Sequence, residues 1–356
     1  MPVDVGTMTS KERVRAALFR KPIDRCPRNV EATPEAAGNL MGVLGVASIE
    51  EVRRALGIDV RHVYPVFRGR VRPPEGRVHF DEWGIGRKFV RFEGGGYQGE
   101  YDEIAVSPLA CAKSVDEVLA YRWPKPDWWD YGQLACAARE TGLDYWTSSG
   151  YYSIFERSWY LMGMERFLTD LVTDPEIPLA VLERTLEFYI EQSLRILEAG
   201  GGLIDQIDTA DDLGTQRGML ISPEIWREHI KPRQERYNRT IKERFQVKIW
   251  YHSCGSITPI IEELIEIGVD ILDPVQTGAA GMEPAWLKKS FGDGLSFHGG
   301  VDTQHTLPYG TPDEVRAEAR FLIDTLGRGG GYILAPTHAI QADVPPENVL
   351  AMCQLD

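Results

Sequence analysis

From residue 140 onward, short apolar runs alternate with amphipathic stretches of about 10–25 residues, which constrains the fold more than any other feature. The pattern is typical of βα units whose strands form a parallel sheet. Together with two earlier runs, it predicts eight strands, over 26–32, 58–65, 143–149, 203–208, 247–252, 270–274, 295–299 and 331–335. Eight βα units are what a closed (β/α)₈ barrel requires, so the sequence predicts an α/β TIM barrel, with an open doubly wound sheet as the alternative.

The regions outside this pattern also have an interpretation. Helical periodicity predicts long helices over 175–199, 222–244 and 312–326. Two earlier helices, with Ser10 and Ser48 as their N-caps, are expected to form an N-terminal helical extension. Residues 66–130 are rich in proline, glycine and tryptophan, and the alternating run 88–92 predicts a β-hairpin. We therefore interpret 66–130 as an excursion inserted into one domain that spans residues 1–356.

Charge and cysteine content argue against several classes of protein. The 39 basic and 53 acidic residues give this 356-residue chain a net charge of −14, whereas nucleic acids and anionic membranes require a basic surface. No apolar run approaches the roughly 20 residues of a membrane-spanning helix. The 5 cysteines include no C-x-x-C pair. We therefore expect free thiols and a cytoplasmic location, with neither nucleic-acid nor membrane partners.

The strongest chemical signal follows the strand predicted over 247–252. His252 and Cys254 stand at i and i+2, so in an extended chain their side chains point the same way. Carboxyl strand ends meet at one mouth of a barrel, so His338, after the last strand, is expected to face them. Two imidazoles and a thiolate suit zinc and leave one tetrahedral position open. The alternative is that all three are packed structural residues, because buried cysteines are common.

Acidic residues follow the strand predicted over 203–208. Asp211 and Asp212 lie beyond its end, in the loop. Carboxylates there can act on a proton of the substrate or orient a metal-bound histidine, so both are candidate catalytic residues. The alternative is that they cap turns and pair with arginines.

Two other strand ends offer candidates for substrate binding. Trp146, Tyr151 and Tyr152 lie in an aromatic-rich segment that can line a pocket for a flat organic group, or can belong to the core. His298 precedes the pair Gly299-Gly300, where the backbone can approach a ligand closely. A packed structural histidine is the alternative for His298.

Taken together, the motifs resemble those of the uroporphyrinogen decarboxylase superfamily, in particular its corrinoid-linked methyltransferase branch. The similar blocks are Ser10-Lys11-Glu12-Arg13-Val14, Pro22-Ile23-Asp24-Arg25-Cys26-Pro27, Asp211-Asp212-Leu213-Gly214, Ile221-Ser222-Pro223-Glu224, His252-Ser253-Cys254-Gly255 and Gly331-Tyr332-Ile333-Leu334-Ala335-Pro336. They span nearly the whole chain. The resemblance implies a (β/α)₈ barrel, in agreement with the strand count.

The resemblance also implies the chemistry. In the methyltransferase branch, zinc is held by the His and Cys of the H-x-C turn and by a late Cys, and these positions fall on His252, Cys254 and His338. The implied activity is methyl transfer between a small methylated molecule and a corrinoid (cobalamin) on a partner protein, and a homodimer is a candidate assembly. Replacing the late thiolate by imidazole makes the metal site more positive, which favours polarising an ether oxygen and hence a methoxy-aromatic donor.

The alternative implied by the superfamily is decarboxylation of a tetrapyrrole or of a small aromatic acid. True uroporphyrinogen decarboxylases carry an arginine-glycine motif near the N-terminus that grips the substrate's propionates. The equivalent segment here is Arg28-Asn29-Val30-Glu31-Ala32-Thr33, which keeps one basic residue. Glu31 is expected to face the substrate and would repel a carboxylate, so methyl transfer is favoured.

Overall fold

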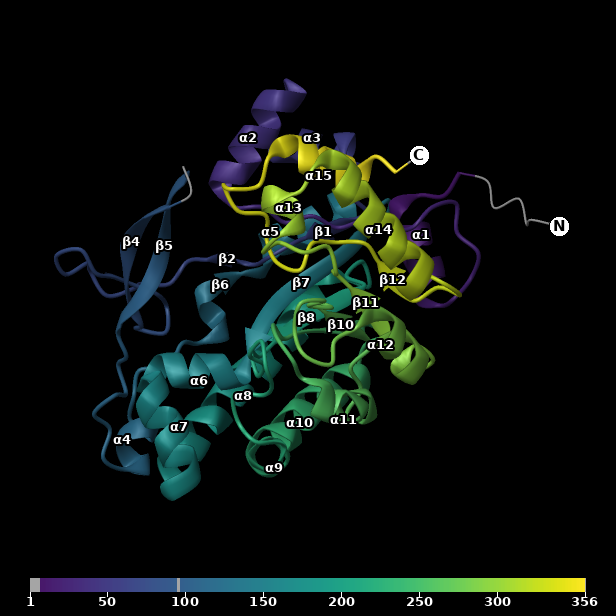
Figure 1. The fold of residues 1–356 in the computed structure, drawn as a ribbon. Helices are drawn as coiled ribbons and strands as arrows, with labels where there is room; N and C mark the ends of the chain where they lie inside the picture. Colours follow the sequence, from purple (N-terminus) through teal and green to yellow (C-terminus); the bar gives the residue numbers. More distant parts are fainter. Residues whose placement is uncertain (1–6, 95–96, 356) are drawn as a thin grey trace.

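In the computed structural model, which describes residues 7–94 and 97–355, seven parallel strands form one curled sheet (Figure 1). The strands are β1 Val60–His62, β7 Trp146–Ser153, β8 Gln206–Ala210, β9 Lys248–His252, β10 Ile271–Asp273, β11 Ser296–His298 and β12 Tyr332–Ile333. Their order across the sheet is the order along the chain. A doubly wound sheet reverses its strand order, so this alternative is excluded.

The segment predicted as the first strand, 26–32, forms isolated bridges instead. Arg28 bridges Leu334 in parallel, and its carbonyl accepts the amide of Asp59 at 2.9 Å. The segment therefore lies between the two outer strands, β12 and β1. Regular pairing is interrupted because Pro27 has no N–H and the Arg28 amide donates to the Asp59 carboxylate at 2.9 Å.

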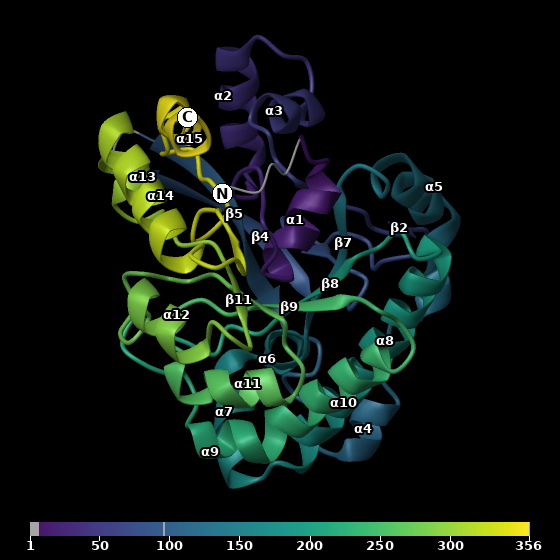
Figure 2. The same cartoon turned by 90° about the vertical axis from the view of Figure 1, so that its right-hand side faces the viewer.

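Helices surround the sheet, as Figure 2 shows for α8, α10, α11 and α12. The helices are α1 Ser10–Leu18, α2 Pro34–Leu44, α3 Ile49–Ala55, α4 Val115–Leu119, α5 Tyr131–Thr141, α6 Ile154–Met162, α7 Met164–Thr173, α8 Glu176–Gly200, α9 Pro223–Ile225, α10 Lys231–Lys242, α11 Ile261–Glu266, α12 Pro284–Phe291, α13 Thr306–Tyr309, α14 Pro312–Leu326 and α15 Pro346–Cys353. The predictions at 175–199 and 312–326 are confirmed as α8 and α14. The prediction at 222–244 is divided by a π-helical turn, Trp226–Ile230, just before Pro232, which cannot donate a helical hydrogen bond.

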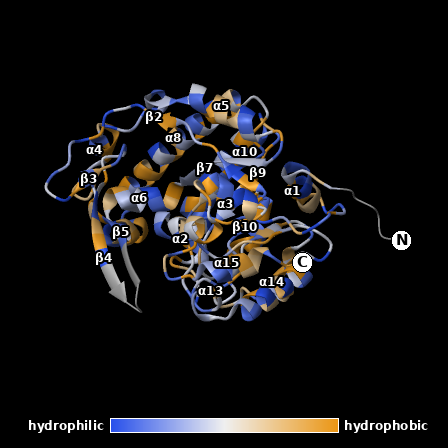
Figure 3. Ribbon diagram, turned by 90° about the horizontal axis from the view of Figure 1, so that it is seen from above, coloured by the Kyte–Doolittle hydropathy of each residue, from blue (hydrophilic) through white to orange (hydrophobic). Residues whose placement is uncertain are grey.

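Helix α14 shows why these segments are helical and lie outside the sheet. Its buried residues Val315, Ala319, Leu322 and Leu326 recur at helical spacing, so one face packs inward. Figure 3 shows hydrophilic and hydrophobic turns mixed along α14. No helix among the described residues is long and apolar enough to cross a membrane.

The first helix covers the amino end of the sheet. Its N-cap is Thr9 rather than the predicted Ser10, because the Thr9 hydroxyl accepts the Glu12 amide and the Glu12 carboxylate accepts the Thr9 amide. The capping prediction for Ser48 is confirmed. Val14 and Leu18 pack against Val60, Trp146 and Ile271, the first residues of β1, β7 and β10, and against Ile333 of β12. The opposite, carboxyl end of the sheet therefore remains for a site.

The 66–130 region forms separate antiparallel sheets. Three strands, β3 His79–Phe80, β4 Gly86–Gly94 and β5 Tyr97–Val106, pair in that order, and β2 Val66–Phe67 pairs with β6 Trp129–Asp130. The hairpin predicted around 88–92 is confirmed as β4 and β5, which extend away from the rest of the molecule in Figure 1.

Candidate functional site

The carboxyl ends of β8 and β9 bring three possible metal ligands together. Single donor atoms of Asp212, His252 and Cys254 all lie within 4.8 Å of one another, and no other such group occurs among residues 7–94 and 97–355. The Nε2 atom of His252 is 3.4 Å from the Cys254 sulfur and 3.6 Å from Oδ1 of Asp212. The Cys254 amide donates to the same Asp212 oxygen at 2.7 Å. The i, i+2 prediction for His252 and Cys254 is therefore confirmed as geometry.

Two glycines permit this close approach. Gly255 adopts φ +80°, and a Cβ at this position would lie 2.6 Å from the carbonyl carbon of Gly214. A Cβ on Gly214 would in turn collide with the carbonyl oxygen of Cys254. The Asp212 loop and the Cys254 turn therefore touch through their backbones, which brings the carboxylate to the thiol.

Asp273, at the end of β10, orients His252. Its Oδ2 lies 2.6 Å from Nδ1 of His252, and its Oδ1 is hydrogen-bonded to Nδ1 of His298. The side-chain NH₂ group of Asn29 lies 3.2 Å from Nε2 of His298. An NH₂ group only donates, so Nε2 accepts this hydrogen bond and the ring proton of His298 lies on Nδ1. Asp273 accepts from both rings and leaves Nε2 of His252 directed at Cys254 and Asp212. We refer to Asp212, His252 and Cys254, as candidate ligands, as the metal-binding group.

The electrostatics of this group suit a cation. Burial lowers the pKa of His252, but hydrogen bonds to Asp273 and Cys254 raise it well above its usual value. Burial raises the pKa of the Cys254 thiol and His252 partly offsets this. A proton therefore sits among these groups, and a divalent metal would replace it on binding.

His338 lies near this group but outside it. The side chain is exposed, and its ring centroid is 6.5 Å from that of His252. Two imidazoles that share a tetrahedral zinc have centroids about 5 Å apart, as Zn–N bonds of about 2.0 Å require. In this structure His338 therefore does not occupy a ligand position beside His252.

A cavity of about 590 Å³ opens beside the metal-binding group. Among the predicted site residues, the structure places Glu31, Tyr151, His252, His298 and His338 in its wall. The ring of Tyr151 lies 5.9 Å from that of His252. The mouth predicted from strand ends therefore exists as a cavity.

Trp146 and Tyr152 lie elsewhere, so the predicted substrate contact is not supported for them. Trp146 belongs to the cluster under α1 and donates to the Gln206 side chain at 2.9 Å. It begins β7, about 17 Å before Tyr151 at roughly 3.3 Å per residue. Tyr152 does not line this cavity, and it is buried with its ring 4.8 Å from that of Tyr189.

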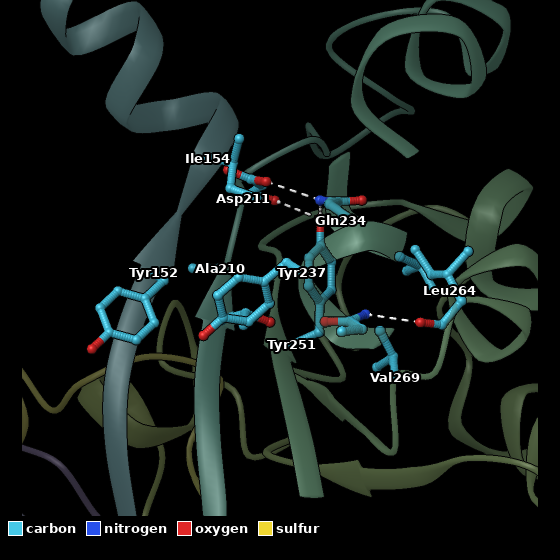
Figure 4. A pocket seen from close by; sticks show the side chains of 12 residues that line it. Tyr152, Ile154, Ala210, Asp211, Gln234, Tyr237, Tyr251, Leu264 and Val269 are labelled. Carbon is cyan, nitrogen blue, oxygen red and sulfur yellow. Dashed lines mark hydrogen bonds between the residues drawn. The ribbon is translucent and has the colours of Figure 1, made fainter. Parts of the chain in front are cut away.

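Asp211 differs from its neighbour Asp212. Its carboxylate is buried and accepts the amides of Phe155 and Glu156, at 2.7 and 3.1 Å, so it caps the start of α6. Figure 4 shows Asp211 hydrogen-bonded to Gln234, whose amide nitrogen donates to the carboxyl group at 2.9 Å. The structure therefore matches the capping alternative for Asp211 and separates it from the cavity.

Sequence reasoning missed His62 and Asp273. His62 ends β1, with Nε2 at 2.9 Å from Glu31 and Nδ1 at 3.4 Å from Asp208. Burial lowers the pKa of His62, but these carboxylates raise it to about 10, so the ring is an imidazolium. Both missed residues end a parallel strand, and applying the strand-end rule to β1 and β10 would have found them.

Comparisons with known proteins agree with this architecture. The chain is 25% identical over 195 residues to the methylcobamide:CoM methyltransferase MtaA of Methanosarcina barkeri, covering 54% of this chain and 52% of that protein. It is 24% identical over 182 residues to a uroporphyrinogen decarboxylase of Chlorobium phaeobacteroides, covering 49% of this chain and 47% of that protein. The chain thus spans about half the length of these relatives. A methyltransferase structure from Methanosarcina mazei superposes with a TM-score of 0.65 at 21% identity, over 97% of both chains, which shows a shared fold.

The family match covers more than half of the chain. The profile of the uroporphyrinogen decarboxylase (URO-D) family matches residues 139–355, which include β7 to β12 and the complete metal-binding group. By this match, the chain belongs to the uroporphyrinogen decarboxylase family.

Proposed function

We propose that this protein is a zinc-dependent methyltransferase that moves a methyl group between a methylated small molecule and a corrinoid on a partner protein. The observation that carries the proposal is the group Asp212, His252 and Cys254, whose donor atoms lie within 4.8 Å of one another at the edge of a cavity. The relative named as a methylcobamide:CoM methyltransferase supports the same reaction class.

The donor set fits zinc better than the harder divalent ions. A thiolate and an imidazole are ligands that zinc prefers, whereas calcium and magnesium require oxygen ligands. We assign the ligands His252, Cys254 and, after rotation into the cavity, His338. When bound, zinc would supply a Lewis acid that polarises the atom bearing the methyl group.

The chain's own residues would position the reaction. Asp273 holds His252 with Nε2 toward the metal, and Asp212 holds the Cys254 amide at 2.7 Å. Tyr151, with its ring 5.9 Å from that of His252, would lie against the substrate and shield it from water. The corrinoid would approach from the open side of the cavity, and a homodimer remains a candidate assembly.

Ligand charge favours one direction of transfer. One thiolate and two neutral imidazoles leave a net positive zinc site, whereas ligation by the Asp212 carboxylate in place of His338 would make it neutral. The positive site favours polarising an ether oxygen, so we propose a methoxy-aromatic donor. Decarboxylation of a tetrapyrrole acid is disfavoured, because the described lining of the cavity contains no arginine or lysine to bind the substrate's carboxylates.

Elemental analysis tests the metal site. Wild type should bind about one zinc per chain, and Cys254→Ala should lose it, whereas Cys136→Ala, at an exposed free cysteine, should keep it. His338→Ala should weaken zinc binding, with His305→Ala as the matched exposed control. Equal zinc in wild type and Cys254→Ala would refute the site.

A methyl-transfer assay tests the direction. Cob(I)alamin should be methylated by methoxy-aromatics, followed by absorbance, and His338→Cys should slow this reaction while zinc is retained. If no methoxy compound reacts but methylcobalamin methylates a thiol, the proposed donor class is wrong.

A further inference from the structure

A second cavity, of about 560 Å³, adjoins the metal-binding cavity through Tyr151, which lines both. We call it the aromatic pocket, because seven of its twelve lining residues are aromatic, against 10% of the whole chain. Its wall contains none of the three residues of the metal-binding group. A role for it goes beyond the proposed function.

The aromatic rings form a packed floor and an open rim. Trp83 lies 4.7 Å from Phe188 and 5.4 Å from Tyr189 by ring centroids, and Trp83 and Tyr189 are buried. Tyr64 and Tyr151 are 52% and 51% exposed and stand at the entrance. A ligand that enters the pocket would therefore meet the faces of Tyr64 and Tyr151, whereas the Trp83 ring is buried and already has the Arg157 guanidinium 5.2 Å from its centroid. Such faces attract cations whose charge is spread over methyl groups.

The two charged residues of the aromatic pocket are Glu82 and Arg157. Among the described residues, no basic side chain forms a salt bridge with Glu82; burial raises its pKa, and the charges of Arg157 and Arg87 offset this only in part. Arg157 donates through Nε to the Tyr189 hydroxyl at 3.1 Å and through Nη1 to Asp81 at 3.4 Å. Within the described chain, no hydrogen bond uses its Nη2, which can therefore meet an anionic group.

We propose that the aromatic pocket binds a compact zwitterion that carries an N-methylated ammonium group and a carboxylate. The ammonium group lies against the aromatic faces with Glu82 as its counter-charge, and the carboxylate accepts from Arg157. A ligand with only a positive charge would leave Nη2 of Arg157 without an acceptor, although Nη1 donates to Asp81, and a ligand with only a negative charge would be repelled by Glu82. One acidic and one basic group in an aromatic wall therefore select a ligand with both charges.

Isothermal titration of the full-length protein with trimethylglycine tests this proposal. We expect it to bind at least about ten times more tightly than tert-butylacetic acid, in which carbon replaces the ammonium nitrogen. Glu82→Gln should weaken trimethylglycine binding about tenfold, whereas Glu140→Gln, at an exposed residue of α5, should not.

A second pair of variants tests the aromatic wall. Tyr64→Leu should weaken binding, whereas Tyr309→Leu, at a tyrosine that is 73% exposed outside the pocket, should leave it unchanged. Both tyrosines are exposed, so the folded state should persist, and a thermal melt checks this. Absence of binding, equal binding of the carbon analogue, or normal binding by Glu82→Gln would each overturn the proposal. The titration requires neither zinc nor a corrinoid, so its failure would leave the proposed methyl transfer standing.

Discussion

Replacing Asp273 by Asn should lower zinc affinity without removing any ligand. The two oxygens of Asp273 accept Nδ1–H groups from His252 and His298, and the His252 contact is 2.6 Å. An asparagine offers one oxygen and one NH₂ group, so one ring must face a donor. His298 keeps its proton on Nδ1 as long as the Asn29 amide donates to its Nε2, a contact of 3.2 Å. His252 would therefore shift its proton to Nε2 and lose the lone pair that binds metal.

The expected loss of zinc affinity follows from what comparable carboxylates contribute in other metal sites. Loss of a carboxylate that orients a metal-bound histidine typically costs 10–100-fold in affinity, or about 1.4–2.7 kcal/mol. Burial raises the pKa of Asp273, but His298 and His252 hold it below its usual value, so the carboxylate is ionised at neutral pH. The variant therefore removes a charge as well as an acceptor. We expect the upper part of this range.

Competition with a chromogenic zinc chelator at neutral pH measures the change. Asp302→Asn is the matched control, because Asp302 contacts the exposed His305 at 2.9 Å in the same kind of pair, away from the cavity. The control should bind zinc as wild type does. If Asp273→Asn binds zinc within about twofold of wild type while remaining folded, Asp273 does not set the proton position of His252.

Other variants separate the site from the fold. Asp212→Asn should reduce methyl transfer while changing the free energy of unfolding by less than about 0.5 kcal/mol, because its side chain is 43% exposed; a larger loss of stability with normal turnover would contradict this. Burial and Glu156 raise the pKa of Asp211 to about 8 from 3.8, so wild-type stability should fall as the pH rises between these two values. In thermal melts, Asp211→Asn should lack this loss of stability, and the same pH dependence in both proteins would contradict the assignment. Asp208 and Glu31 outweigh burial and raise the pKa of His62 to about 10 from 6.5, so the stability lost in His62→Gln should be largest below pH 6.5 and should vanish toward pH 10; a constant difference in thermal melts would count against the imidazolium. Gly255→Ala should cost more than about 1 kcal/mol in urea unfolding, since φ is +80° and the added carbon meets Gly214; wild-type stability would show that the loops can separate.

Much of the fold was predictable because it depends on local periodicity. Seven of the eight predicted strands occur in the curled sheet, and α8 and α14 begin and end within one residue of their predicted limits. Segment 26–32 was harder to predict, because its apolar pattern is typical of a strand. Its pairing is interrupted by Pro27 and by the carboxylate of Asp59, a residue 31 positions further along the chain than Arg28. The cap at Thr9 shows the usual uncertainty of helix ends, where two adjacent hydroxyl residues compete.

The candidate site was predictable where strand direction alone determines position. His252 and Cys254 share a strand end, so alternation along an extended chain was sufficient to place them together. Tyr151 and Tyr152 were proposed from aromatic content rather than from alternation, and of these two only Tyr151 lines the cavity beside His252. Sequence could not separate Asp211 from Asp212, because both follow β8.

Sequence alone thus determined the order of βα units and the strand ends that carry polar groups, because both follow from hydrophobic periodicity along the chain. Tertiary structure decided which groups face each other. Asp212 reaches Cys254 only because Gly214 and Gly255 let two loops touch, and Asp273 bridges two histidines only because β9, β10 and β11 are adjacent. These contacts join residues far apart in sequence, and their distances depend on the curvature of the whole sheet, which no local pattern encodes.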